Sequence, residues 1–317
     1  MVEFVQHVIN GLSLGSIYAL IALGYTMVFG ILQLINFAHS DVYMLGAFIG
    51  FYISRWMGLG QVSSFPAFLA VIACAMVGCA IIGFTIERFA YRPLRKSPRI
   101  NVLITAVGVS LFLEFSGQLL FGSDPKFFPQ IYTPEGGNWV FHFGETVTQA
   151  DGSVMAASEL NINPLHVTVL LISLVLMAIL QFIIFKTRVG RAMRAVSFNH
   201  DLARLMGIPT DRVISYTFML GSSLAGAAGV LVGMVYPKIE PLMGVMPGLK
   251  AFVAAVLGGI GNVTGALVGA ITLGLAEEFV VGYWAPTYRD ALAFVILILI
   301  LLFKPAGLFG VSRREKV

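Results

Sequence analysis

The chain has 317 residues, of which 58% are hydrophobic and only 11% carry a charge. Too few polar side chains are present to cover the surface of a soluble domain, which excludes that class and predicts a polytopic membrane protein. The formal net charge of +4 comes from basic residues that cluster between apolar runs without interleaved aromatic residues, so it does not indicate nucleic-acid binding.

The apolar runs approach or exceed 18 residues and lack the alternating pattern of a membrane β-barrel, so the predicted fold is all-α. We expect one transmembrane domain over residues 1–317 with about eight spans. The first span is expected over residues 8–29, because the N-terminus lacks the basic region of a signal peptide. Gly11 and Gly15 predict close packing of this span against another helix.

Polar residues interrupt the apolar run before the second span, which continues to about residue 52. They include Asn36, His39 and Asp41. Polar groups at membrane depth must face protein or water rather than lipid, so these three residues are candidates for lining a translocation path. The alternative is a short connection at the membrane surface in which Asp41 caps the second span, and we favour this alternative.

The third and fourth spans are expected over residues 65–86 and 102–121. The loop between them carries five basic residues, which predicts that it lies in the cytoplasm. Ser110, Glu114 and Gln118 form a polar stripe along one face of the fourth helix. An acidic residue within a span is a candidate for a functional cavity, but Glu114 could equally bond Gln118 for packing alone, and both interpretations stay open.

Residues 122–163 are rich in Gly, Pro, Asn and acidic residues, and Lys126 is their single basic residue. We therefore expect an external, periplasmic loop, although long loops are weak markers of orientation. A short hairpin is expected around residues 139–143. The loop is also a candidate docking surface for an outside protein, and the fifth span follows it over residues 164–185.

An apolar segment over residues 248–282 is broken in its middle by glycines and Asn262. The basic C-terminus is expected in the cytoplasm, so the last span, residues 291–303, must start outside and the broken segment must return to the side it left. Two short spans or a re-entrant hairpin would both satisfy this requirement. Because broken helices often line substrate paths in transporters, Gly259, Gly261 and Asn262 are further candidates for the translocation path.

Residues 186–212 form a strongly basic interval before the sixth span, residues 213–235, and are therefore expected in the cytoplasm. Asn199 can cap a short helix within this interval, and Gly207, followed by Pro209, can end it.

The apolar residues of this short helix share one face, because Leu202, Leu205 and Met206 are spaced at i, i+3 and i+4. His200 and Arg204 are expected to point elsewhere. So short a helix would not persist alone in water, and either the rest of the protein or a partner must hold it. An ordinary basic connecting loop is the alternative.

The chemistry of the sequence argues against an enzyme. It contains no Gly-Lys dipeptide and hence no P-loop, so any ATP that drives transport would be bound by another subunit. No Cys/His cluster has the spacing of metal ligands, and Cys74 and Cys79 do not share a helical face. We predict no catalytic residue, no metal site and no cofactor in this chain.

The segment from Asp201 to Gly207 resembles the E-A-A-x-x-x-G loop of bacterial ABC importer permeases, with Asp in place of Glu and Leu202 in place of the first Ala. Longer strings resemble the membrane permease of high-affinity branched-chain amino-acid ABC transporters, over about residues 11–307. The chain departs from that family at Ser40, where Gly is usual, and in the loop 132–163. The strings are GLSLGSIYALIALGYTMVFGILQLINFAHSDVYMLGAF, ERFAYRPLR, TRVGRAMRAVSFNHDLARLMGIPTDRV and GLKAFVAAVLGGIGNVTGALVGA.

The resemblance implies a type II-like ABC importer permease fold in the bacterial inner membrane, with a periplasmic N-terminus and a cytoplasmic C-terminus. It implies four kinds of partner: membrane lipid, a second homologous permease, two cytoplasmic ATPases that bind ATP and Mg, and a periplasmic protein that delivers leucine, isoleucine or valine. Closure of the ATPase dimer would push on the short helix and switch the permease between outward-facing and inward-facing states. The implied coupling residues are Asn199, Asp201, Leu202, Ala203, Leu205, Met206 and Gly207.

Two alternatives to this function stay open. Related permeases handle urea, amides or other amino acids. A channel or secondary transporter that works alone would use Glu114 and Asp41 as ion-linked or proton-linked groups.

Overall fold

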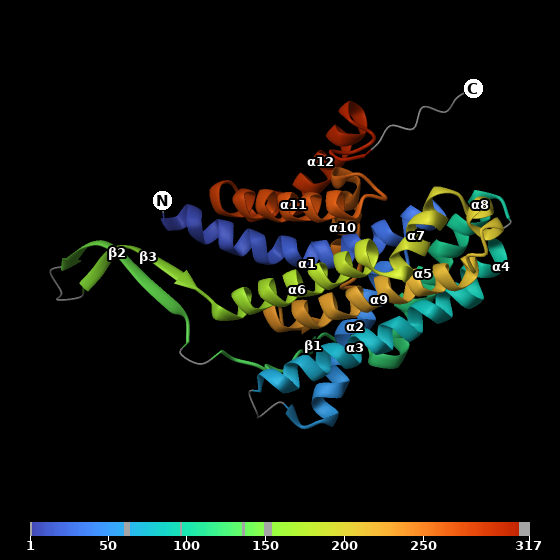
Figure 1. Ribbon diagram of the computed structural model, residues 1–317. Helices are drawn as coiled ribbons and strands as arrows, with labels where there is room; N and C mark the ends of the chain where they lie inside the picture. The colour runs from blue at the N-terminus through green and yellow to red at the C-terminus, as the bar shows by residue number, and fades with distance from the viewer. Residues whose placement is uncertain (1, 60–63, 96, 135–136, 149–153, 311–317) are drawn as a thin grey trace.

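The computed structural model describes residues 2–59, 64–95, 97–134, 137–148 and 154–310, and it is predominantly helical (Figure 1). The described residues also include four strands and two short helical turns between the helices. The helices are α1 (Val2–Leu32), α2 (His39–Trp56), α3 (Phe65–Ile86), α4 (Arg92–Leu94), α5 (Arg99–Phe121), α6 (Pro164–Lys186), α7 (Arg188–Phe198), α8 (His200–Leu205), α9 (Thr210–Val235), α10 (Val245–Gly258), α11 (Val263–Tyr283) and α12 (Arg289–Phe303), with a π-helical turn η2 (Glu87–Tyr91) and a 3-10 turn η3 (Pro286–Tyr288).

The prediction of a polytopic helical membrane protein is confirmed. Within the described residues, seven helices are long and apolar enough to cross a membrane, against about eight expected. One of them, Phe65–Leu94, joins α3, η2 and α4. Helix α2 is not among the seven; it has 18 residues, but it begins with His39, Ser40 and Asp41 and carries Arg55 in its last turn.

Helix α1 lies at the centre of the bundle and is buried along most of its length. It runs antiparallel to α11, and the two backbones approach closely because Gly11 and Gly15 face Leu275 and Ile271. A Cβ atom on Gly15 would lie only 2.9 Å from Ile271 Cα. The predicted packing face is therefore confirmed. Small residues at this contact allow the backbones of two membrane helices to approach closely.

Helix α9 packs between α2 and α3 in the same manner. A Cβ atom on Gly226 would lie 2.8 Å from Ala75 O on α3, and one on Gly229 would collide with the backbone of Tyr43 on α2.

Ser40, the departure from the usual family sequence, fits beside Gly244 and Gly248 at the start of α10 and donates a 2.9 Å hydrogen bond to Phe37 O.

The predicted hairpin is confirmed and is longer than expected. Strand β2 (Trp139–Thr148) pairs antiparallel with β3 (Val154–Ile162), with Trp139 opposite Ile162. The hairpin projects from one end of the helical bundle, away from α7 and α8 (Figure 1). A second, minimal pair joins β1 (Lys126–Phe127) to β4 (Lys238–Ile239), so the described part of the chain contains two small two-stranded sheets.

The broken segment consists of two unequal helices. Helix α10 has 14 residues, or about 21 Å, and does not reach across a hydrocarbon layer of about 30 Å. Helix α11 has 21 residues and returns as a complete span. Gly259 (φ 104°) and Gly261 (φ 94°) allow the turn between them, because side chains other than glycine disfavour positive φ.

Candidate functional site

Helix α8 is capped at both ends by the residues that the sequence indicated. The Asn199 side chain accepts hydrogen bonds from the backbone N–H groups of Asp201 (2.9 Å) and Leu202 (3.0 Å). At the other end Gly207 adopts φ 80°, and the N–H groups of Gly207 and Ile208 bond back into the last turn at 3.0 Å each. This arrangement is the Schellman motif, and it fixes the chain beyond α8 as well as α8 itself.

The apolar face of α8 points to the outside of the molecule. Leu202 is exposed, and the exposed fractions of Leu205 and Met206 are 82% and 83%. Phe198, at the end of α7, is also exposed and extends the same region. We call Phe198, Leu202, Leu205 and Met206 the coupling patch. Ala203 lies on the opposite side and is buried, so it holds α8 against the protein rather than offering it to a partner.

The end of α1 anchors the segment that carries the coupling patch. Ser197 Oγ donates a 2.5 Å hydrogen bond to Gly30 O, and His200 Nε2 lies 2.8 Å from Ile31 O, to which it donates. His200 therefore points inward, as expected for a residue off the apolar face. The exposed patch is held rigidly by the body of the protein, although a helix of this length has little stability of its own.

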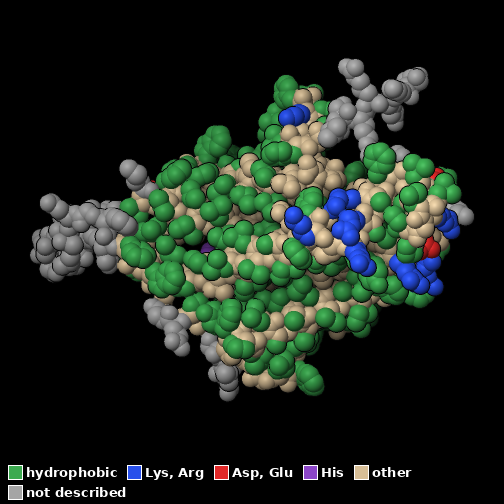
Figure 2. Space-filling model, viewed as in Figure 1, with side chains coloured by type: hydrophobic (Ala, Val, Ile, Leu, Met, Phe, Trp, Pro, Cys, Tyr) green, Lys and Arg blue, Asp and Glu red, His purple; other side chains and the backbone are tan. Residues whose placement is uncertain are grey.

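Basic side chains gather on the same end of the molecule as the coupling patch. Figure 2 shows Lys and Arg side chains around α7 and near α8, at the end opposite the hairpin, while hydrophobic side chains cover most of the surface between. Exposed basic residues of α6 and α7 contribute to this region. They are Lys186, Arg188, Arg191 and Arg194.

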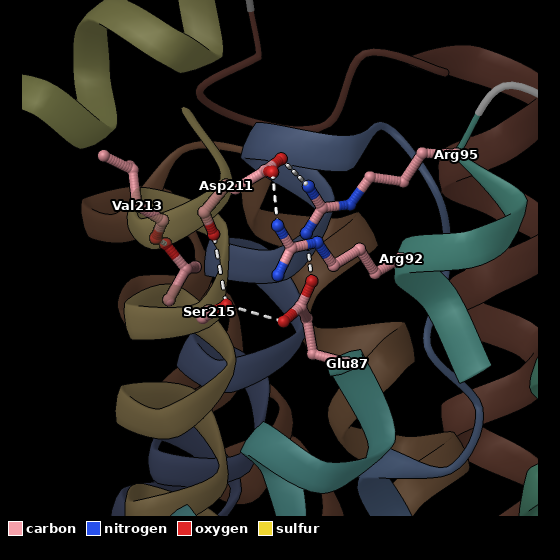
Figure 3. Close-up of polar contacts among 7 residues, drawn as sticks. Glu87, Arg92, Arg95, Asp211, Val213 and Ser215 are labelled. Atoms are coloured by element: carbon pink, nitrogen blue, oxygen red, sulfur yellow. Dashed lines mark hydrogen bonds and ion pairs between the residues drawn. The ribbon is translucent and has the colours of Figure 1, made fainter. Parts of the chain in front are cut away.

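A charged network lies beside α8 (Figure 3). It connects the start of α9 with the helical continuation of α3, formed by η2, α4 and Arg95, which we call the end of α3. Asp211 accepts from Arg92 Nη2 at 2.6 Å and from Arg95 Nη1 at 2.7 Å. Arg95 also pairs with Glu87, whose other oxygen accepts from Ser215 Oγ at 2.6 Å. Glu87 is fully buried. Arg92 and Arg95 belong to the five basic residues from which the sequence predicts a cytoplasmic loop. The sequence did not identify Asp211 and Glu87 as their partners.

A short connection precedes α2, as expected, but the predicted helix cap at Asp41 is wrong. The N-cap position of α2 is occupied by Ala38, and Asp41 instead accepts a 2.5 Å hydrogen bond from Ser110 on α5. Asp41 and His39 are both buried, and His39 packs edge-on against Tyr25 with ring centroids 4.9 Å apart. These residues are buried because α2 begins inside the bundle, where neighbouring helices surround its first turn.

Asn36 is buried as well, and it accepts a 2.7 Å hydrogen bond from Tyr91 in η2. On α5, Glu114 and Gln118 are only partly buried, and of the predicted polar stripe Ser110 is the residue that faces α2. The polar stripe of α5 therefore meets the start of α2 through Ser110 and Asp41.

The remaining candidates for the translocation path lie at the turn between α10 and α11. Gly261 and Asn262 line a cavity of about 410 Å³ together with Gly30 and Ser197. Asn262 caps α11 by accepting from Gly265 N–H at 3.1 Å, and it donates to Phe309 O at 3.1 Å. Of the candidates at this turn, Gly261 and Asn262 line this cavity, which also reaches Ser197 near the end of α7.

Sequence reasoning missed a buried charge cluster at the other end of α10 and α11. Lys250 Nζ lies 3.0 Å from Glu277 Oε2 and 2.7 Å from Asp290 Oδ1. The same Glu277 oxygen accepts from Tyr18 OH at 3.1 Å and from Arg289 Nε at 3.2 Å. Lys250 and Glu277 each interrupt an apolar segment, which was the available signal.

Comparisons with known proteins complete the description. A family model described as "Branched-chain amino acid transport system / permease component" matches residues 7–301. The high-affinity branched-chain amino acid transport system permease protein LivH of Escherichia coli (strain K12) is 41% identical over 315 residues, covering 99% of this chain and 98% of that protein. The corresponding protein BraD of Pseudomonas aeruginosa is 41% identical with the same coverage, and a probable LivH of Methanocaldococcus jannaschii is 26% identical over 95% of this chain and 90% of its own length.

Proposed function

This chain belongs to the family of branched-chain amino acid transport permeases, and from this membership we infer that it is a membrane subunit that carries leucine, isoleucine and valine into the cell. Members of this family are components of ABC transport systems. The energy for uptake comes from ATP that partner subunits bind with Mg and hydrolyse, and this chain supplies the passage through the bacterial inner membrane.

The observation that carries the proposal is the coupling patch. The exposed leucine and methionine side chains of the capped helix α8, with Phe198 at the end of α7, are costly next to water, so they fit a groove on a soluble protein. Two cytoplasmic ATPases are the partners of this kind that an ABC importer requires. Their closure pushes on α8 and switches the permease between outward-facing and inward-facing states.

Two further partners complete the proposed complex. A second homologous permease forms the other half of the membrane pathway, and a periplasmic binding protein delivers the amino acid to the external face. In this arrangement the β2–β3 hairpin and the N-terminus are periplasmic, and α7, α8 and the C-terminus are cytoplasmic. The clustering of Lys and Arg around α7 and α8 supports this orientation (Figure 2).

The test is uptake and ATP hydrolysis by the assembled transporter in proteoliposomes. Binding protein loaded with leucine, isoleucine or valine should stimulate both activities, whereas urea or an amide should not. Indifference to all three amino acids would reject the substrate assignment. As a control, the permease alone should show no gradient-driven flux; flux by the isolated chain would instead favour a channel or secondary transporter.

A further inference from the structure

Helix α8 is joined to α9 by a rigid connection. The Schellman motif fixes Gly207 and Ile208, and Pro209 then directly precedes α9. Proline has a fixed φ, so few torsions remain free between the coupling patch and Asp211 in the first turn of α9. A displacement of α8 is therefore passed to the start of α9 rather than absorbed by the connection.

Helix α8 and the end of α3 face the same hollow in the molecule. A cavity of about 370 Å³ lies between them, and its wall includes His200 and Arg204 from α8, Tyr91 from η2, and Asp211 from α9. Beside this cavity, α9 meets the end of α3 through the rings of Phe218 and Tyr91, whose centroids lie 5.3 Å apart, and through polar contacts. The polar contacts are the bonds of Asp211 with Arg92 and Arg95 and the bond of Ser215 with Glu87.

Arg95 is the centre of these contacts because it binds two carboxylates at once. One side of its planar guanidinium group pairs with Asp211, which is 52% exposed, and the other pairs with Glu87, which is fully buried. A lysine ammonium has no such fork, because its donors all lie on one nitrogen, whereas Arg95 reaches its two carboxylates from two separate nitrogens. A buried carboxylate also needs its cationic partner, so Glu87 holds Arg95 in this position.

The network continues from η2 to the connection between α1 and α2. Tyr91, in the same π-helical turn as Glu87, donates to Asn36 at 2.7 Å. Turns of this type are frequent at functional sites because they interrupt the regular hydrogen bonding of a helix. The start of α9, the end of α3 and the chain before α2 are thereby joined through neighbouring polar contacts.

We propose that Arg95 is a positioning residue for ATP-driven transport: it fastens the start of α9 to the end of α3, so that a push on α8 moves both helices together. This inference rests on the proposed function. Without the network, the first turn of α9 loses its polar contacts with the end of α3 and keeps the packing of α9 on α3, so that ATP hydrolysis is converted less efficiently into movement of the membrane helices.

Two variants test the role without depending on a single substitution. Asp211→Ala removes the exposed end of the network and leaves the buried part intact. The double variant Glu87→Gln with Arg95→Gln removes both buried charges together, so neither is left unpaired, whereas Arg95→Gln alone leaves Glu87 without its cation. Arg88→Gln is the matched control, because Arg88 is exposed and lies in the same turn as Glu87.

The measurement is amino-acid uptake per ATP hydrolysed by the assembled transporter in proteoliposomes. In both test variants ATP hydrolysis should be retained while uptake per ATP falls about fivefold or more, the lower range of typical coupling between sites. The control should match wild type. If uptake and hydrolysis fall in parallel, or if uptake per ATP is unchanged, Arg95 does not have this role. If the wild-type transporter takes up none of the three amino acids, the proposed function fails instead.

Discussion

At the scale of single residues, Glu277 shows how this protein keeps charge inside an apolar bundle. Its carboxylate is fully buried, and one oxygen accepts from Lys250, Arg289 and Tyr18. Asp290 provides a second partner for Lys250. Burial of each charge alone would be very unfavourable, and the paired arrangement offsets most of that cost. The cluster also joins four helices, since its residues come from α1, α10, α11 and α12.

Removal of one cation from this cluster should therefore destabilise the fold. We expect Lys250→Met to lower the free energy of unfolding by about 3 kcal/mol, because Glu277 stays buried with less compensation. Lys238→Met is the control: Lys238 pairs with Glu240 at 2.9 Å, but it is 58% exposed, and we expect a loss below about 1 kcal/mol. Denaturant unfolding of the purified protein in detergent measures both. Equal losses in the two variants would show that the cluster contributes little.

At the scale of the element, α8 combines strong local signals with weak intrinsic stability. Its six residues are too few for a stable isolated helix, yet the Asn199 cap and the Gly207 turn define both ends. Its inner side is held by Ala203 and His200, which leaves the apolar side free to meet a partner. The shape of the coupling patch is therefore set before any partner binds.

A charge placed on the coupling patch should weaken the binding of the ATPase subunits. Leu205→Asp removes apolar area worth about 2 kcal/mol on burial and adds a carboxylate that would be desolvated. We expect binding of the ATPase subunits to weaken at least about tenfold, with a matching loss of uptake, while the permease still reaches the membrane. Leu205→Met, which keeps an apolar side chain of similar volume, should behave as wild type. Affinity measurements with the purified ATPase subunit test this prediction. Undiminished binding to the Leu205→Asp variant would show that α8 is not the contact.

At the scale of the whole molecule, the two ends of the bundle differ in chemistry. One end carries the β2–β3 hairpin, and the other carries the basic residues of α6 and α7, the coupling patch and the turn at Gly259 and Gly261 (Figures 1 and 2). Because basic residues are retained on the cytoplasmic side of membrane proteins, we expect the end with α7 and α8 to face the cytoplasm.

The orientation can be checked by cysteine labelling in a background in which Cys74 and Cys79 are replaced by Ala. Asn138→Cys, before the hairpin, should react with a membrane-impermeant maleimide in intact cells. Arg191→Cys, on α7, should react only after the cells are permeabilised. The reverse pattern of labelling would place the hairpin in the cytoplasm and exclude α8 as the contact with cytoplasmic ATPases.

The sequence by itself determined the features that depend on neighbouring residues. The long apolar runs defined the helical membrane class, Asn199 and Gly207 defined the ends of α8, and the glycines near residue 260 defined the break between α10 and α11. Each of these follows from local backbone and solvation requirements, which are the same whatever packs nearby.

Only the tertiary structure decided the features that join distant segments. Asp41 is an acidic residue in the first turn of α2, where a cap was expected, but the side chain that bonds its carboxylate is Ser110 on α5. Arg95 reaches Asp211, more than a hundred positions further along the chain, and Lys250 reaches Glu277 through the fold of α10 against α11. A buried polar group must find whichever partner the packing brings within reach, and no spacing in the sequence specifies which partner that is.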